Sequence, residues 1–234
     1  MRPGQTLLYR PGRAAERTFA EMRYLFVLCL LLCGSFLPGH AQSLLRNGSF
    51  ERGVRGQYRM PSHWVNAGPA EQSPPDVHTN ARGHFGVTQQ AAAGEVFMGL
   101  VSRADYTFEM LGQRPTEKLR AGVTYRLTLS VCRSPQFASV TRRSNYQLED
   151  FTTPIPFDVY VAKRANGGAI ELISRSAPVD HTDWRTYTVE FTPTRDWKYL
   201  RIGAGLNGVH AKAVNGHILI DEVRLDLIVP NAPR

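Results

Sequence analysis

The sequence predicts an all-β protein, an antiparallel β-sandwich of the jelly-roll type. Apolar and polar residues alternate over short segments, most clearly in 124–132 (TYRLTLSVC). Gly, Pro and Asn separate these segments, and the Asn-Gly pairs at 166–167 and 215–216 suit tight turns. No long segment has a helical period, and the crossover helices that a parallel sheet needs are missing.

The expected strands follow one another along most of the chain. Six segments alternate clearly: 124–132, 157–161, 170–173, 187–191, 199–202 and 217–220. Four less regular candidates lie upstream of them: 44–51, 84–87, 95–101 and 106–111. Residues 114–120 are the only segment that could hold a helical turn. Two irregular stretches remain, 52–81 and 135–154, and loops of that length in a sandwich tend to be functional or disordered.

The first 41 residues predict an export signal. An apolar core over 24–37 follows Arg23. Gly39 and Ala41 are the small residues expected at positions −3 and −1 of a cleavage site after Ala41. The protein is therefore expected to be secreted, or to lie at the cell surface or in the periplasm.

The start of this signal has several interpretations. Met22 begins a compact signal by itself, so residues 1–21 are interpreted as an over-extended start, with a longer signal as the alternative. A lipid on Cys33 and a retained anchor helix are further alternatives, although the apolar core is short for a membrane span. The remainder, 42–234, is expected to form a single β-sandwich domain, and by its size it has room for a core.

Charge and cysteine content exclude several classes of partner. The chain has a formal net charge of +8, but its arginines are scattered, and Arg142-Arg143 is the only adjacent arginine pair. A nucleic-acid binder needs a clustered basic stripe, so nucleic acid is not an expected partner. No apolar run outside the signal is long enough for a bilayer, so no membrane insertion is expected after signal removal. Outside the signal only Cys132 remains, which excludes an internal disulfide.

Three local sequence patterns occur in the order, and at the separations, in which a known family has them. They are 45–51 (LRNGSFE) followed by 61–64 (PSHW), then 119–127 (LRAGVTYRL), and finally 218–225 (ILIDEVRL). They resemble the motifs of cenC-type carbohydrate-binding modules, in which an N-terminal NGSFE…W and a C-terminal IDEV bracket a galactose-binding-like jelly roll. The chain also resembles small exported bacterial proteins of the Bacteroidetes type. The resemblance covers almost all of residues 44–227 and implies non-covalent carbohydrate binding, although 73–80 and 135–154 match no ligand-binding pattern of the family.

The C-terminal motif predicts a β-bulge. Ile218 and Ile220 share one parity, whereas Val223 and Leu225 have the opposite one. The strand must therefore slip by one residue around 221–222.

A structural calcium ion is expected beside this bulge, in agreement with what the resemblance implies. The first and last strands of a jelly roll can be neighbours, which would bring Glu51 close to Asp221. Carboxylates beside free carbonyl groups form the oxygen-rich environment that calcium prefers. The predicted ligands are Glu51 and Asp221, with Asn47 as a weaker candidate. The alternative is that Glu51 pairs with an arginine and Asp221 caps a turn.

Aromatic residues near the irregular stretches are candidates for sugar contacts. The apolar face of a pyranose packs on an aromatic ring while nearby polar groups bind its hydroxyls. The predicted binding residues are Trp64, Asp76, His78 and Phe85, with Trp184 as a further contact. The alternative is that tryptophans at strand starts cover the edge of the core.

These observations predict an exported, non-catalytic carbohydrate-binding module whose partner is a glycan or polysaccharide. No G-x-S-x-G, H-E-x-x-H or phosphate-loop motif is present, so no enzymatic activity is expected. Two alternatives stay open. The first is a surface or envelope protein that serves adhesion or assembly by binding a protein partner. The second is a glycan-active hydrolase or lyase, whose paired carboxylates would come from residues such as Glu95, Glu109, Glu149, Asp150 or Asp158.

Overall fold

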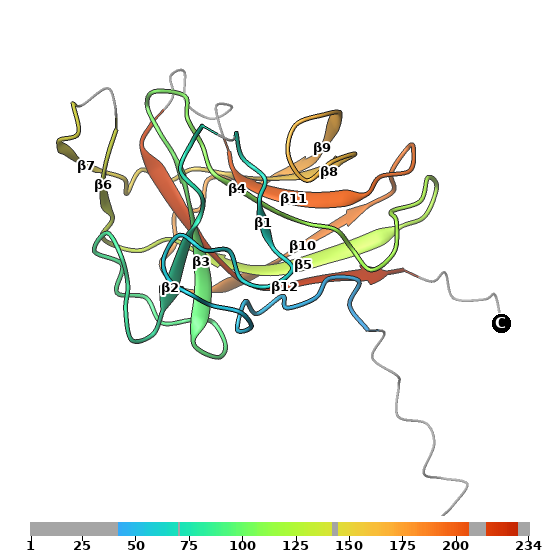
Figure 1. The fold of residues 1–234 in the computed structure, drawn as a ribbon, viewed down its shortest axis with the longest axis horizontal. Helices are drawn as coiled ribbons and strands as arrows, with labels where there is room; N and C mark the ends of the chain where they lie inside the picture. Colours follow the sequence, from blue (N-terminus) through green and yellow to red (C-terminus); the bar gives the residue numbers. More distant parts are fainter. Residues whose placement is uncertain (1–41, 70, 142–144, 206–213, 229–234) are drawn as a thin grey trace, which may run out of the picture. The chain divides into compact units, whose positions relative to one another are not determined.

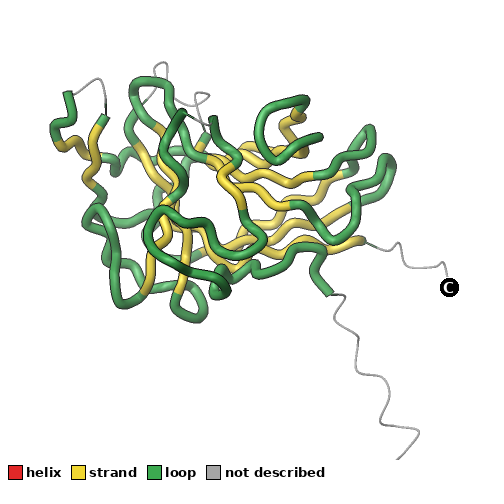
Figure 2. Tube along the Cα trace, in the orientation of Figure 1, coloured by secondary structure: helices red, strands yellow, loops and turns green. Residues whose placement is uncertain are grey.

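Two antiparallel sheets lie face to face and enclose the core in the computed structural model of the chain (Figure 1). The structure describes residues 42–69, 71–141, 145–205 and 214–228. The predicted signal peptide, residues 1–41, lies outside these ranges. Figure 2 shows only strands and loops in the described part of the chain, and the predicted all-β sandwich of jelly-roll type is thereby confirmed.

Each of the two sheets contains five strands among the described residues. The first sheet has the order β1-β4-β11-β8-β9, and the second sheet has the order β10-β5-β12-β3-β2. The strands of the first sheet are β1 (Val65–Asn66), β4 (Met110–Gln113), β8 (Phe157–Ala162), β9 (Ile170–Arg175) and β11 (Tyr199–Ala204). Those of the second sheet are β2 (Asp76–Thr79), β3 (Val96–Ser102), β5 (Tyr125–Cys132), β10 (Arg185–Phe191) and β12 (Gly216–Leu227). A separate hairpin, β6 (Ala138–Val140) and β7 (Leu148–Asp150), stands at the end of the sandwich near β2 and β3 (Figure 1).

The strands expected from residue 124 onward are all present, with bounds shifted by a few residues. These segments alternate because one face of each strand packs into the sandwich, which fixes the pattern in the sequence. Upstream, the expected strand at 95–101 is β3, and the one at 106–111 is reduced to β4.

Two expected strands upstream are absent. Residues 44–51 and 84–87 form turns instead of strands, because Asn47, Phe50 and Phe85 adopt positive φ angles of 51°, 60° and 58°. Such angles interrupt an extended chain. Residues 114–120 contain no helical turn, since this segment is pinned by an isolated bridge to the segment before β11.

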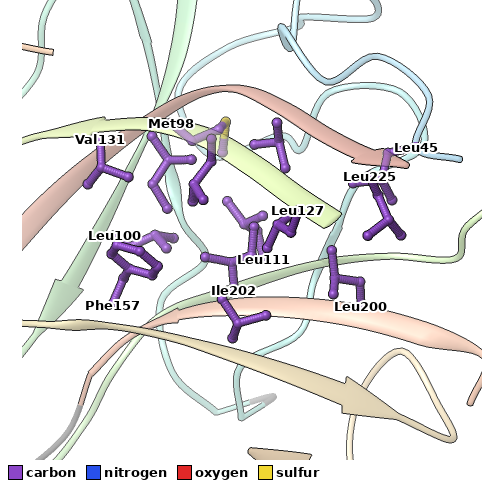
Figure 3. Close-up of a cluster of buried hydrophobic side chains, with 14 of the residues drawn as sticks. Leu45, Met98, Leu100, Leu111, Leu127, Val131, Phe157, Leu200, Ile202 and Leu225 are labelled. Atoms are coloured by element: carbon purple, nitrogen blue, oxygen red, sulfur yellow. The ribbon is translucent and has the colours of Figure 1, made fainter. Parts of the chain in front are cut away.

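The main core lies between the two sheets (Figure 3). Alternate residues of the central strands supply it, among them Met98 and Leu100 of β3, Leu127 of β5, and Leu200 and Ile202 of β11. Each of these side chains is fully excluded from solvent. Burial of one such side chain contributes roughly 1.5–3 kcal/mol relative to exposure, so this core is the main source of stability.

The first and last described segments lie side by side, as the sequence predicted. The backbone N–H of Leu44 donates to the carbonyl of Leu225 (2.7 Å), and that of Val223 donates to the carbonyl of Gly48 (3.0 Å). A Cβ atom at Gly48 would lie 1.9 Å from the Val223 oxygen, so this approach requires glycine. The predicted bulge in β12 is confirmed: the register with β5 shifts between Asp221 and Arg224.

The second sheet is covered on its outer face as well. In β3 every side chain is buried, because Phe97 and Val101 point away from the main core into a second apolar cluster. The members of this cluster are Val87, Phe97, Val101, Cys132, Phe137, Phe151 and Leu219, and Phe85, Ala91 and Trp184 pack against it. Apart from Trp184, the loop residues of this set are Phe85, Val87 and Ala91 on one segment, and Phe137 and Phe151, which flank the hairpin β6–β7, on the other. These side chains cover the outer face of the sheet.

His217 of β12 fastens one of these segments to the sheet. Its Nε2 accepts a hydrogen bond from the backbone N–H of Ser134 (2.7 Å), and its Nδ1 lies 2.7 Å from the carbonyl of Phe151. Nδ1 therefore carries the proton, and the ring is neutral. Burial lowers the pKa of His217 from 6.5 to about 4.

This anchor predicts a loss of stability in mild acid. The unfolded chain binds a proton at His217 at a higher pH than the folded protein does, so stability falls as the pH drops from about 6.5 toward about 4. For the wild type we expect His217 to contribute about 2 kcal/mol to the loss of unfolding free energy between about pH 7.5 and about pH 5. In His217→Gln, whose amide can make both hydrogen bonds, the loss should be smaller by that amount. Urea unfolding at the two pH values measures it, with the exposed His63→Gln as the control; equal losses in wild type and His217→Gln would contradict the prediction.

Candidate binding site

A cavity of about 510 Å³ lies at the end of the covered face of the second sheet. Asp76 of β2 and Val101 of β3 form part of its floor, and the turn 103–109 between β3 and β4 forms one wall. The hairpin β6–β7 and the segment before β2 close the other sides, through Val140 and Pro74 among others. The cavity thus lies between the second sheet, the turn 103–109, the hairpin β6–β7 and the segment before β2.

Aromatic side chains surround the opening of this cavity. Tyr58 and Tyr146 line it and are 57% and 65% exposed. Phe85 also lines it, half-buried, with its ring stacked on Phe137 at a centroid distance of 5.4 Å. Phe85 is therefore held in place by the second apolar cluster, whereas the two tyrosines offer ring surface to solvent.

A buried ion pair forms the polar wall of the cavity. The Glu109 side chain is 1% exposed, and its Oε1 accepts hydrogen bonds from the Arg103 guanidinium (2.6 Å) and the Ser73 hydroxyl (2.6 Å). Its Oε2 accepts from the backbone N–H of Val101 (3.2 Å). Burial raises the pKa of Glu109 from 4.5 to about 6, even though Arg103 opposes the change.

Asp76 is the second buried carboxyl group of the cavity, and it has far fewer partners. It is 4% exposed, and one of its oxygens receives a long hydrogen bond of 3.4 Å from the Gln57 side chain. Burial and the nearby charge of Glu109 raise the pKa of Asp76 well above its usual value. Titratable groups with such shifts in a cavity are typical of functional sites.

Two of the five predicted sugar contacts, Asp76 and Phe85, line this cavity. Trp64 is 4% exposed, packs on Phe50 at 5.1 Å and donates from Nε1 to the carbonyl of Asn47 (2.8 Å). Its ring therefore offers no free face for a sugar, and it has the core-covering role given as the alternative. The signal for Trp64 was its loop position, which does not report burial.

His78 and Trp184 lie under and beside the second apolar cluster. His78 is fully buried, stacks on Phe97 at 5.1 Å, and accepts at Nδ1 from the backbone N–H of His84 (3.2 Å). Burial lowers the pKa of His78 to about 3, so it stays neutral. Trp184 makes an edge contact with Phe97 at 5.8 Å and donates from Nε1 to the carbonyl of Gln90 (2.8 Å). Neither residue lines the cavity.

Sequence reasoning did not single out Tyr58, Tyr146 or Arg103 as site residues, and it named Glu109 only as one of several carboxylates. A usable signal did exist for the tyrosines. Both are aromatic residues inside the stretches 52–81 and 135–154, which the sequence predicts to be irregular and where no alternating pattern assigns an aromatic residue to the core.

The predicted calcium ligands Glu51 and Asp221 meet at one loop. Oε1 of Glu51 accepts from the backbone N–H groups of Glu95 (2.8 Å) and Val96 (2.9 Å). Oδ2 of Asp221 accepts from the N–H groups of Ala92 (2.9 Å) and Ala93 (3.2 Å). The two carboxylates therefore hold the loop 92–96 from both sides.

Asn47 points elsewhere. Its amide bonds to the backbone of Arg52 and Ser62, so it closes the turn that follows it. Calcium is bound by oxygen atoms, whereas the neighbours of Glu51 and Asp221 described above are N–H groups, so these contacts fit a carboxylate-held loop better than an ion. Among the described residues no group of three or more His, Cys, Asp or Glu side chains could hold a metal. Calcium at this loop stays a prediction.

No family model matches the chain, and no curated protein matches it. Among solved structures, a cyclase from Fischerella sp. TAU is similar with a TM-score of 0.48 and 15% identity over 80% of this chain and 98% of that chain. The K2 cleaved adhesin domain of Lys-gingipain is similar with a TM-score of 0.47 and 11% identity, covering 76% and 96%. An arabinose-bound α-L-arabinofuranosidase has a TM-score of 0.49 and 12% identity, covering 81% of this chain and 27% of that one. These similarities do not assign the chain to a family, and the cenC-type resemblance stays a prediction.

None of the described residues forms a helix long and apolar enough to cross a bilayer.

The buried ion pair predicts a strong effect of removing its arginine. Arg103→Met leaves the Glu109 carboxylate buried without a positive partner, which should lower the unfolding free energy by about 3 kcal/mol at neutral pH. Below about pH 5 the loss should shrink, because a protonated Glu109 needs no cation. The double variant Arg103→Met with Glu109→Gln should recover most of the stability. Urea unfolding of the single and double variants measures this coupling; additive losses would contradict it.

The calcium prediction has its own test at the loop 92–96. If Glu51 and Asp221 hold calcium, adding the ion to chelator-treated protein should raise the melting temperature of the wild type but not of Glu51→Gln. A wild-type melting temperature that is the same with calcium and with chelator would remove the ion from this site.

Proposed function

We propose that the protein binds glycans non-covalently in the cavity between the turn 103–109 and the hairpin β6–β7. The observation that carries this proposal is the combination of exposed Tyr58 and Tyr146 rings with buried polar groups in one cavity of about 510 Å³. That volume falls in the range of small-molecule sites and is large enough for a few sugar rings.

The two kinds of side chain suit the two kinds of surface on a sugar. The apolar face of a pyranose would pack on Tyr58 or Tyr146, where ring area is exposed. Its hydroxyl groups would be bound by the carboxylates at the floor and by Ser73, whose hydroxyl already bridges to Glu109. Phe85 would act as a fixed apolar wall.

We further propose that the protein acts outside the cell or in the periplasm and that it binds without cleaving. The proposal of export depends on residues 1–41, which the structure does not describe. Binding without cleavage is favoured because the Glu109 oxygens are held by Arg103, Ser73 and the Val101 N–H, which leaves this carboxylate poorly placed for attack.

Two observations favour the other candidate functions. On the hairpin β6–β7, Leu148 is 74% exposed and stands next to exposed Tyr146, and an exposed apolar surface of this kind suits a protein partner in adhesion or assembly. The presence of Asp76 and Glu109 in one cavity suits a glycan hydrolase or lyase, because paired carboxyl groups with shifted pKa values divide acid and base roles.

Glycan binding predicts a loss of affinity when the exposed rings are removed. Tyr58→Ala and Tyr146→Ala should each weaken binding of a polysaccharide roughly tenfold, because each removes a stacking surface. Tyr106→Ala is the matched control, since Tyr106 is 58% exposed but does not line the cavity. A glycan array followed by affinity electrophoresis measures the change. If no glycan binds, or if the control weakens binding as much as the two variants, the proposal is wrong.

The candidates differ in what happens to a bound polysaccharide. We expect incubation with the wild type to release no reducing ends or unsaturated products. Turnover that is lost in Asp76→Asn would establish the enzymatic candidate instead.

A further inference from the structure

Among the described residues, the lining of the cavity is acidic although the chain as a whole is basic. Its lining includes the carboxyl groups of Glu71, Asp76, Asp105 and Glu109, and Arg103 is the only Lys or Arg among its described lining residues. The whole chain has a formal net charge of +8. Four carboxyl groups around one guanidinium in such a protein therefore concentrate negative charge at one place.

Local contacts account for two of these carboxyl groups. Glu109 is compensated by Arg103, Ser73 and the Val101 N–H. Asp105 caps the turn, since its Oδ1 accepts from the N–H and the hydroxyl of Thr107 (3.1 and 2.6 Å). Arg103 pairs with Glu109 and also donates to Ser73. Burial and the charge of Glu109 raise the pKa of Asp76, and the charge of Arg103 opposes this change, so a single guanidinium serves both carboxyl groups.

Asp76 is the group that these contacts leave out. It is 4% exposed and lines the cavity, and its one hydrogen bond among the described residues is the 3.4 Å contact from Gln57 to Oδ1. Oδ2 has no hydrogen-bond donor among the described residues, but it is not one of their fully enclosed unpaired atoms, so it keeps contact with solvent where Asp76 lines the cavity. A largely buried carboxylate oxygen without a donor is usually satisfied by a partner.

An aromatic ring lines the same cavity as Asp76 and Glu109, that of Tyr58. Burial and then the charges of these two carboxyl groups raise the pKa of Tyr58. Tyr58 is 57% exposed, and an aromatic face beside carboxylates is the arrangement that recognises an ammonium group. A neutral sugar hydroxyl would need no such excess of negative charge.

We propose that the cavity binds a cationic group, a primary ammonium, which lies against Asp76 with the Tyr58 ring beside it. This inference rests on the proposed function, and together they make the preferred glycan one with free amino groups. Asp76 supplies the charge and the hydrogen-bond acceptor, Glu109 and Glu71 add to the negative potential, and Tyr146 remains available for stacking on a neighbouring sugar.

The test compares ligands that differ only at the amino group. Calorimetry at about pH 6 and low salt would use a β-1,4-linked tetramer of glucosamine, the same tetramer with every amine N-acetylated, and a β-1,4-linked glucose tetramer. We expect the glucosamine tetramer to bind at least about tenfold more tightly than either neutral tetramer. The preference should shrink at about 0.5 M salt, because screening weakens an ionic contact at a partly open cavity.

Variants identify the group responsible. Asp76→Asn should abolish the preference for the amine while keeping its melting temperature at or above that of the wild type, because it removes a buried charge. Asp180→Asn, at an exposed position outside the cavity, makes the same change in net charge and should keep the preference. Equal binding of the three tetramers by the wild type, or an intact preference in Asp76→Asn, would overturn the inference.

The outcomes for the inference and for the proposed function are distinct. If neutral and cationic tetramers bind equally and Tyr146→Ala weakens both, glycan binding holds and the ammonium inference fails. If no tetramer binds but cadaverine binds and loses its affinity in Asp76→Asn, the ammonium site holds and glycan binding fails.

Discussion

The double-sided burial of β3 is the constraint on which the rest of the structure depends. One face of this strand fills the sandwich, and the other carries Phe97 and Val101 into a second apolar cluster. A sheet face of this kind is stable only if something keeps water from it, and here the segment 85–91 does so together with Phe137 and Phe151, which flank the hairpin β6–β7. His217 ties one loop to the sheet by two short hydrogen bonds, and the cavity forms where this cover ends.

The buried carboxyl groups at the cavity do not favour folding of the chain. Glu109 and Asp76 are both almost fully buried, yet one arginine serves the two, and both carboxyl pKa values are raised. Replacing such groups with apolar side chains of similar volume would be neutral or favourable for folding. Their position in one cavity therefore relates them to a ligand more readily than to the fold, as is common where ionisable groups are buried.

The two ends of the described chain hold the loop 92–96, which leads into β3. The N-terminal segment pairs with β12 beyond the bulge, and the carboxylates of Glu51 and Asp221 hold the loop 92–96 through its N–H groups. This arrangement satisfies backbone donors that a loop next to an edge would otherwise leave unpaired. These hydrogen bonds also fix the start of β3. The motifs at the two ends of the described chain therefore support the same strand whose residue Val101 lines the cavity.

The sequence alone determined the local structure and the pairing of the chain ends. Strand periodicity follows from one-sided burial, and the parity change after Ile220 required a bulge because side chains alternate strictly along a strand.

Only the tertiary structure decided which aromatic residues face solvent. Trp64 and Tyr58 lie in the same irregular stretch, yet packing on Phe50 buries the first while the second stays open. The partners of Asp76 and Glu109 lie up to 36 residues away, at Ser73 for Glu109, and no local pattern records such contacts. Burial and charge balance depend on every segment that packs around a site, so they become defined only when the chain is folded.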